Sequence, residues 1–167
     1  KRAIASLTKL MVALIIMEHH DFSEIVHVSE NFTPVAGASM KLEKGEKITV
    51  GNLMNGLLIP SGNDAAQVLA IFHSGSEMEF VKKMNTRAHF LGMNGTHFVN
   101  VHGLDADDHY SSARDLSILA RKILEYSKIR EIAQTKSKTV TSLDGNIRHE
   151  LINTNELLNS PFPIFGL

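Results

Sequence analysis

The stretch Ser6-Leu7-Thr8-Lys9-Leu10-Met11-Val12-Ala13-Leu14-Ile15-Ile16-Met17 decides how the rest of the chain folds. Its apolar residues continue almost all the way round a helix, so we predict a helix over residues 6–18 in the centre of a core. The longest apolar run, residues 10–17, is too short to span a bilayer. The serine and the lysine at its start lie three residues apart and therefore on one face of a helix.

A hydroxyl and an amine in this arrangement can form a nucleophile and its base. A serine hydroxyl is a weak nucleophile at neutral pH until an adjacent base removes its proton. Burial lowers the pKa of a lysine and frees its amine for that task. The pattern Ser-x-x-Lys by itself occurs by chance roughly once in a chain of this size. The buried helix that follows Lys9 favours the catalytic interpretation of Ser6 and Lys9 over a capping serine and a surface lysine.

A second polar motif, Ser61-Gly62-Asn63, lies between two predicted helices, residues 52–59 and 64–73. Such a tripeptide is common in ordinary turns. A polar tip held between two packed helices is also a place where a site can hold rigid hydrogen-bonding groups. We therefore expect Ser61 and Asn63 to complete the hydrogen-bond circuit that starts at Ser6 and Lys9.

The remaining sequence predicts more helices than strands. Short extended segments are expected at residues 25–28, 40–42 and 47–50, with a loop at 33–39. Two helices begin at capping serines, one running from Ser76 to Gly92 and one from Ser112 through Leu124. Asp144-Gly145 predicts a two-residue hairpin turn between strands at residues 138–143 and 146–152.

The composition is that of one ordinary globular domain. The 167 residues are 43% hydrophobic and 21% charged with a net charge of −1, so no basic patch indicates a nucleic-acid partner. Cysteine is absent, which fits an exported protein without disulfides but is also common in the cytosol. The densest histidine clusters, His19-His20 and residues 102–109, lack recognised zinc spacing, so we expect no metal and no cofactor.

Several co-linear segments carry a resemblance to one family. They are Ile4-Ala5-Ser6-Leu7-Thr8-Lys9-Leu10-Met11, Leu58-Ile59-Pro60-Ser61-Gly62-Asn63-Asp64-Ala65-Ala66, Leu91-Gly92-Met93, Thr96-His97-Phe98, His102-Gly103-Leu104-Asp105 and Ser111-Ser112-Ala113-Arg114-Asp115-Leu116. Together they resemble the serine-type D-alanyl-D-alanine carboxypeptidases, which are the low-molecular-mass penicillin-binding proteins. The resemblance implies an α+β, β-lactamase/transpeptidase-like fold in which a helical cluster packs on an antiparallel sheet.

The resemblance also implies that parts of the family's domain are not in this chain. The family has strands before the nucleophile helix, and it carries Lys-Thr-Gly on a strand shortly after a segment similar to Phe165-Gly166-Leu167. We therefore expect residues 1–167 to be a partial catalytic domain, mainly its helical half with a short hairpin, lacking most of the central sheet. Without that sheet, we expect the helix over residues 6–18 to expose a large apolar face.

A mechanism follows from the resemblance. The substrate would be the D-Ala-D-Ala end of a peptidoglycan stem peptide, and penicillins would acylate the same serine. Ser6 would attack the penultimate carbonyl and Lys9 would take the proton. Ser61 would relay the proton to the leaving amine, while Asn63 would bind the substrate amide and hold Lys9 in place. The loop that shapes the site would contain His102 and Asp105.

Activity and location are further implications of the resemblance. One oxyanion donor and the cation for the terminal carboxylate belong to the Lys-Thr-Gly strand in the family, so the 167-residue chain alone should have little or no activity. The family acts on the cell wall, which implies an exported protein in the periplasm or at the outer face of the cytoplasmic membrane. The whole protein would associate with that membrane through a C-terminal segment that is not present here.

Two alternatives remain open at this point. A serine β-lactamase is disfavoured because class A enzymes have Ser-Asp-Asn where this chain has Ser61-Gly62-Asn63. Glu150 and Glu156 lie in or beside the hairpin, so no glutamate-bearing loop of the β-lactamase kind is evident. A non-catalytic penicillin-binding or cell-wall-sensing module is disfavoured because all four polar positions of the two motifs are intact.

Overall fold

Helices gathered around one central helix dominate the structure, a computed structural model that describes residues 1–160. The helices are α1 (Thr8–His19), α2 (Val50–Leu58), α3 (Asn63–Ser74), α4 (Glu77–Phe90), α5 (Ala113–Ile123) and α6 (Ser127–Gln134), with 3-10 turns at Ala5–Leu7 and Glu156–Asn159. Strand β1 (Ile25–His27) pairs antiparallel with β2 (Lys47–Thr49), and β3 (Ser137–Thr141) pairs antiparallel with β4 (Arg148–Ile152). The segment 165–167, expected to precede a Lys-Thr-Gly strand, lies outside the described residues.

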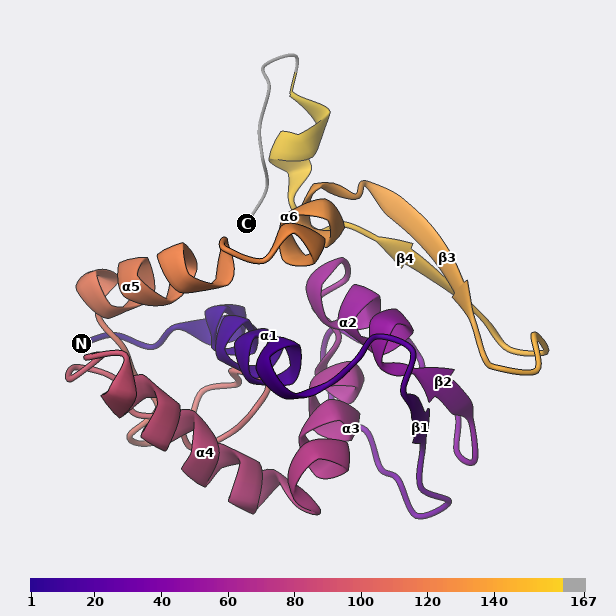
Figure 1. Cartoon of the computed structure of the whole chain (residues 1–167), viewed down its shortest axis with the longest axis horizontal. Coiled ribbons are helices and arrows are strands. Elements are labelled where there is room, and N and C mark those ends of the chain that lie inside the picture. Colours follow the sequence, from indigo (N-terminus) through magenta and orange to yellow (C-terminus); the bar gives the residue numbers. More distant parts are fainter. Residues whose placement is uncertain (161–167) are drawn as a thin grey trace.

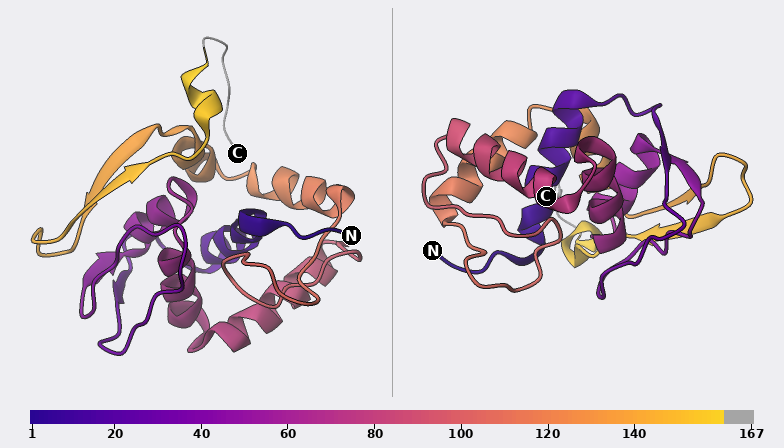
Figure 2. Two further views of the ribbon diagram at one scale, coloured as in Figure 1. Left: turned by 180° about the vertical axis from the view of Figure 1, so that it is seen from behind. Right: turned by 90° about the horizontal axis from the view of Figure 1, so that it is seen from below.

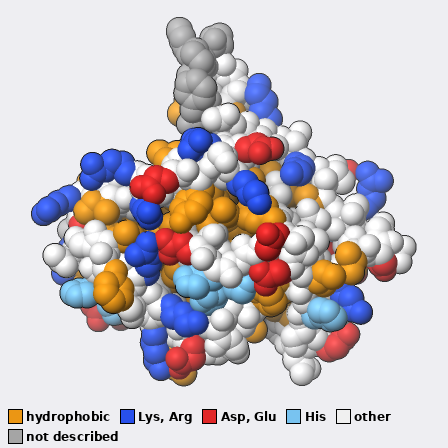
Figure 3. Space-filling view, in the orientation of Figure 1, with side chains coloured by type: hydrophobic (Ala, Val, Ile, Leu, Met, Phe, Trp, Pro, Cys, Tyr) orange, Lys and Arg blue, Asp and Glu red, His pale blue; other side chains and the backbone are white. Residues whose placement is uncertain are grey.

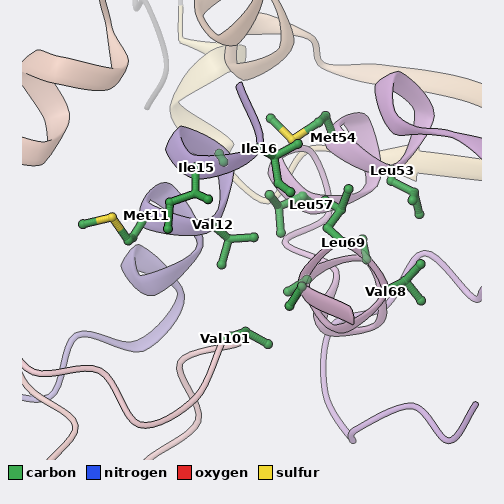
Figure 4. Close-up of a cluster of buried hydrophobic side chains, with 14 of the residues drawn as sticks. Met11, Val12, Ile15, Ile16, Leu53, Met54, Leu57, Val68, Leu69 and Val101 are labelled. Carbon is green, nitrogen blue, oxygen red and sulfur yellow. The ribbon is translucent and has the colours of Figure 1, made fainter. Parts of the chain in front are cut away.

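Helix α1 lies in the middle of this arrangement, as its sequence predicts. It contacts α2, α3, α4 and α5, and these helices surround it in Figures 1 and 2. The side chains of residues 11–16 are all at most 2% exposed. Figure 4 shows Ile16 beside Met54 and Leu57 of α2, whereas Met11 points to the opposite side of α1. Each fully buried aliphatic side chain contributes about 1.5–3 kcal/mol of transfer free energy, so this helix makes a substantial contribution to core stability.

The expectation that α1 exposes a large apolar face is wrong. The four neighbouring helices cover it from within the described part of the chain, and only Leu7, just before α1, is a strongly exposed apolar residue there at 46%. Hydrophobic side chains do reach the surface near the middle of the face in Figure 3, among charged and histidine side chains. No helix within residues 1–160 combines the length and the apolarity needed to cross a membrane.

The predicted extended segments are partly confirmed. Strands β1 and β2 form where residues 25–28 and 47–50 predict them, and residues 33–39 form a loop. Residues 40–42 do not form a strand, because the backbone N–H groups of Met40 and Leu42 donate to the carboxylate of Asp64 instead of to a neighbouring strand. Val50 leaves β2 and begins α2, since the Thr49 side chain caps that helix.

Both predicted serine caps are confirmed, and one helix was not predicted. The Ser76 and Ser112 hydroxyls accept hydrogen bonds from the backbone N–H groups three residues later, at 3.2 and 3.1 Å. Helix α6 has no side-chain cap at Tyr126 and spans only eight residues. Its apolar side chains are buried against other elements of the fold. The helix therefore depends on those contacts, and the segment itself carries only a weak local signal for a helix.

The hairpin is confirmed, but its turn is longer than predicted. The β3–β4 ladder ends at Thr141 and Arg148, and Ser142 then donates from its N–H to the Ile147 carbonyl at 3.0 Å. The connection therefore has four residues, 143–146. The Asp144 carboxylate explains the extra length, because it accepts bonds from the Ser142 hydroxyl and from the backbone N–H of Asn146.

One buried carboxylate fastens the loop at residues 33–42 to the start of α3. Asp64 is completely buried in the first helical turn, where the positive end of the helix stabilises its charge. It accepts hydrogen bonds from the Ser39 hydroxyl at 2.6 Å and from the backbone N–H groups of Met40, Leu42 and Ala65 at 3.0, 3.1 and 2.9 Å. This clamp fixes the position of the Ser61-Gly62-Asn63 turn, which immediately precedes it.

Replacement of Asp64 by alanine should destabilise the protein strongly. The change removes the acceptor of three backbone N–H groups on the buried residues Met40, Leu42 and Ala65, so we expect a loss of about 3 kcal/mol or more in the free energy of unfolding. Asp144→Ala is the matched control, because Asp144 also accepts several hydrogen bonds but is exposed, and it should cost about 1 kcal/mol or less. Urea unfolding measures both, and equal losses would contradict the assigned importance of the Asp64 clamp.

Candidate active site

Ser6 sits on a strained turn that leads into α1. It lies in the 3-10 turn Ala5–Leu7, and Ala5 has a left-handed φ of 46°. The loop that covers this turn approaches so closely at Gly103 that a Cβ there would lie 1.9 Å from the Ala5 carbonyl oxygen. Only glycine fits at that position, where φ is also positive at 87°. Strain of this kind persists where the surrounding structure fixes the backbone, and it is typical of functional sites.

Lys9 lies beside Ser6 and is almost completely buried. Its Nζ donates to Ser6 Oγ at 3.2 Å and to the backbone carbonyl of His102 at 2.8 Å, and the residue is 2% exposed. Burial lowers the pKa of the Lys9 amine to about 8, although the negative charge of Asp64 partly opposes that shift. The structure thus brings together a hydroxyl and an amine that loses its proton far more readily than an ordinary lysine.

Ser61 reaches the same place from another element. Ser6, Lys9 and Ser61 line one cavity of about 470 Å³. Ser61 has a left-handed φ of 60°, and its buried hydroxyl has no hydrogen-bond partner among residues 1–160. A buried polar group without a partner costs stability, so it needs an explanation other than folding. Ser61 thus brings a buried hydroxyl, without a partner in the described part of the chain, to the wall of the cavity that Ser6 and Lys9 line.

The rest of the cavity wall is mostly apolar, with a polar stretch at one side. The apolar lining residues are Ile4, Ala5, Leu7, Leu57, Leu58 and Ala133, and the polar ones are Asn153, Thr154 and Asn155. The Thr154 N–H donates to the Ile59 carbonyl at 3.2 Å, which attaches this stretch next to the Ser61 turn. Sequence reasoning missed these three residues, although a run of polar residues directly after a strand is a usable signal.

Asn63 does not join the other three side chains. It is buried at 3% exposure, its Nδ2 donates to the Ala36 carbonyl at 2.8 Å, and its backbone N–H donates to the Ala38 carbonyl at 2.7 Å. It is not among the residues that line the cavity, and within residues 1–160 it makes no hydrogen bond to Lys9. Its observed contacts fasten the loop at residues 33–42, and its predicted substrate contact stays a prediction.

A buried histidine that sequence reasoning missed supports the start of α1. The Nδ1 of His109 accepts from the Val99 N–H at 3.1 Å, so its Nε2 carries the proton and donates to Thr8 Oγ1 at 2.8 Å. Burial, with His102 and His97 nearby, lowers the pKa of His109 and keeps it neutral. His102 acts through its backbone carbonyl, whereas Asp105 is exposed.

The paired histidines lie away from the cavity. His20 Nε2 and His73 Nδ1 are 2.9 Å apart, and His19 packs its ring edge-on against His73. Neither His19 nor His20 lines the cavity around Ser6. In the part of the chain that is described, no group of three or more histidine or acidic side chains is placed to hold a metal ion.

Comparisons with known proteins agree on one family. The sequence profile of the peptidase S11 family, described as D-alanyl-D-alanine carboxypeptidase, matches residues 1–164. The D-alanyl-D-alanine carboxypeptidase DacF of Bacillus subtilis (strain 168) is 42% identical over 161 residues, which are 93% of this chain and 41% of DacF. The crystal structure of the Streptomyces K15 DD-transpeptidase matches with a TM-score of 0.88 at 30% identity, covering 99% of this chain and 70% of that one.

A second solved structure, penicillin binding protein 6B from Escherichia coli, matches with a TM-score of 0.81 at 36% identity over 94% of this chain and 51% of that one. The expected fold class is therefore confirmed: the described helices and small sheets have the penicillin-binding protein and transpeptidase fold. The chain spans 35–41% of the length of the first curated relatives that it matches. On this sequence match and this structural likeness, the chain belongs to the peptidase S11 family, the D-alanyl-D-alanine carboxypeptidases.

Proposed function

We propose that this chain carries the nucleophile and the base of a serine D-alanyl-D-alanine carboxypeptidase, which removes the terminal D-Ala from peptidoglycan stem peptides. The observation that carries the proposal is the buried Lys9 amine, 3.2 Å from Ser6 Oγ and with its pKa lowered to about 8. At pH 7 about a tenth of such amines are neutral, against about one in a few thousand for an ordinary lysine. Lys9 is therefore a competent base near neutral pH.

The proposed reaction proceeds through an acyl-enzyme. Ser6 Oγ attacks the carbonyl carbon of the penultimate D-Ala while Lys9 Nζ takes the hydroxyl proton. The C–N bond then breaks, the amine of the terminal D-Ala receives a proton through the Ser61 hydroxyl, and Ser6 is left esterified. Water attacks the ester, releases the shortened peptide and restores the Ser6 hydroxyl. The unpartnered Ser61 hydroxyl in the same cavity supports its relay role.

Two further contacts belong to the proposal. The backbone N–H of Ser6 supplies one oxyanion donor, at the start of the helix whose positive end favours negative charge. Asn63 binds the substrate amide, and its Oδ1, which makes no hydrogen bond within residues 1–160, is the atom that accepts from that N–H. The observed bond from Asn63 Nδ2 to the Ala36 carbonyl would orient the side chain rather than compete with the substrate.

The proposal extends to the whole protein. We infer that residues 1–167 are part of a longer catalytic domain, because the chain spans only 41% of DacF. The site of action is outside the cytoplasmic membrane, where peptidoglycan is found, and a C-terminal segment of the whole protein associates with that membrane. Penicillins are expected ligands, since one of the matched structures is a penicillin-binding protein by name. No nucleic acid or cofactor takes part.

In the whole protein, benzylpenicillin should form one covalent adduct, attached to Ser6. Ser6→Ala should abolish the adduct, because it removes the only atom that can become acylated in the proposed mechanism. Ser117→Ala on the exposed side of α5 is the matched control and should leave the adduct unchanged. Intact-mass measurement checks all three proteins. An adduct that survives in Ser6→Ala would overturn the assignment of the nucleophile, and fast nitrocefin turnover would indicate a β-lactamase.

The contribution of Lys9 to the acylation rate should rise with pH and level off above about pH 8. The base must be neutral to accept a proton, and the lowered pKa makes the neutral Lys9 amine available from about pH 8 instead of about 10.5. Below about pH 8 we expect the acylation rate to fall about tenfold for each pH unit by which the pH is lowered. The acylation rate of Lys9→Arg should be about a hundredfold or more lower than that of the wild type, since arginine stays charged and cannot accept the proton. Rates of penicillin acylation test this, and a flat profile between about pH 6 and about pH 9 would contradict it.

The 167-residue chain alone should release little or no D-Ala from a peptide that ends in D-Ala-D-Ala. Among residues 1–160, Lys9 is the only cation that lines the cavity, and it is committed to Ser6, so the terminal carboxylate lacks a cationic partner. Loss of one oxyanion donor costs about a hundredfold in rate or more. An assay for free D-Ala, with the whole protein as the positive control, checks this. Comparable rates for the two would show that the chain is sufficient.

A further inference from the structure

A buried ion pair lies away from the catalytic cavity, between β4 and the segment that leads into β2. His149 on β4 is 3% exposed, its Nδ1 lies 2.9 Å from the Met40 carbonyl oxygen, and its Nε2 lies 2.7 Å from Glu46 Oε1. The other carboxylate oxygen of Glu46 accepts from the Glu43 N–H at 3.1 Å. A carbonyl and a carboxylate oxygen can only accept, so both ring nitrogens donate and His149 is a charged imidazolium.

The charges around His149 favour that state. Glu46 from the preceding loop and Asp64 from α3 raise the pKa of His149 above its usual value, while burial opposes them. Lys41, Glu43, Arg148 and Glu150 line the open cavity beside the histidine. Of these, Arg148 and Glu150 flank His149 along β4 and are exposed to solvent, whereas His149 is buried.

Met40 connects this pair to the Ser61-Gly62-Asn63 turn. Its carbonyl accepts from His149, and its N–H donates to Asp64 Oδ1 at 3.0 Å. A Cβ on Gly62 would lie 3.3 Å from the Met40 nitrogen and 2.8 Å from Asp64 Oδ1, and a Cβ on Gly56 would lie 2.1 Å from the Met40 sulfur. Met40 therefore packs directly against the turn, and the turn cannot shift toward it unless Met40 moves.

We propose that the His149–Glu46 pair positions the Ser61 hydroxyl for reaction by holding Met40, which in turn holds the Ser61-Gly62-Asn63 turn through Asp64. Neither member of the pair lines the cavity around Ser6, so they act only through other residues. The catalytic part of this inference rests on the proposed function. The structural part, a charged histidine that keeps the turn in place, does not.

The direction of the pH effect follows from the raised pKa. The contribution of His149 to stability is fully present below its unfolded pKa of about 6.5 and is lost as the pH rises through its higher folded pKa. Loss of the proton removes one donor, so either the Met40 carbonyl or the Glu46 carboxylate stays buried without a partner. The turn should then loosen on the alkaline side.

Side-chain ¹⁵N NMR tests the charge state without any activity measurement. At about pH 6.5 both nitrogens of His149 should be protonated, whereas His109 should show one protonated nitrogen, which makes it an internal reference. His149→Gln should speed hydrogen exchange of the Gly62 and Asn63 amides about tenfold or more. His27→Gln is the matched control, because His27 is exposed on β1. This variant should leave the exchange rates of the Gly62 and Asn63 amides unchanged. A neutral His149, or unchanged exchange in His149→Gln, would overturn the inference.

The pH profile of penicillin acylation in the whole protein tests the link to the site. Loss of the His149 proton should add a fall of about fivefold or more to the wild-type profile, on top of the rise and plateau set by Lys9, whereas His149→Gln should start at the lower rate and should lack this fall. Glu46→Gln keeps the size and one acceptor but removes the charge, so the fall should move to lower pH. A fall retained in His149→Gln would refute the positioning role, whereas absence of any Ser6 adduct in wild type would refute the proposed function instead.

Discussion

The burial of one amine at the start of the central helix is the constraint on which the rest of the structure depends. Lys9 is 2% exposed, so its amine needs nearby acceptors, and it finds them in Ser6 Oγ and the His102 carbonyl. The contact with the His102 carbonyl requires that α1 begin under the loop at residues 97–109, and that loop comes close enough only because Gly103 has no side chain. The same burial lowers the pKa of the amine, so the packing and the chemistry have one cause.

A second buried charge has a comparable role for the other motif. The carboxylate of Asp64 collects donors from the loop at residues 33–42, and this loop in turn accepts two hydrogen bonds from Asn63. The left-handed backbone at Ser61 is therefore held from both sides. Because strain of this kind costs about 1–3 kcal/mol, the clamp has to offset it locally, and the fully buried position of Asp64 makes its hydrogen bonds strong enough to do so.

The sequence predicts those features whose signals are local. The apolar run of residues 10–17 predicts a central helix, the serines at 76 and 112 predict helix starts, and Asp144-Gly145 predicts a hairpin. Apart from the length of the hairpin turn, which the Asp144 side chain sets locally, the failures are tertiary. Residues 40–42 look extended, but a carboxylate more than twenty residues later takes their N–H groups. Likewise the face of α1 is covered by helices that a local pattern does not position, and α6 forms because its apolar side chains are buried by other elements.

In the candidate site, too, local spacing predicts some features, and tertiary contacts decide the others. Ser6 and Lys9 come together because they are three residues apart at a helix start, a relation that sequence alone gives. Ser61 joins them only through the fold, and Asn63, predicted to join them too, faces the loop instead. The difference is physical: Ser61 precedes α3 with a left-handed backbone and lines the cavity, whereas Asn63 is already the first residue of α3 and bonds to the loop. A two-residue offset at a helix start thus separates a hydroxyl that has no partner among residues 1–160 from an amide that is bonded to the loop.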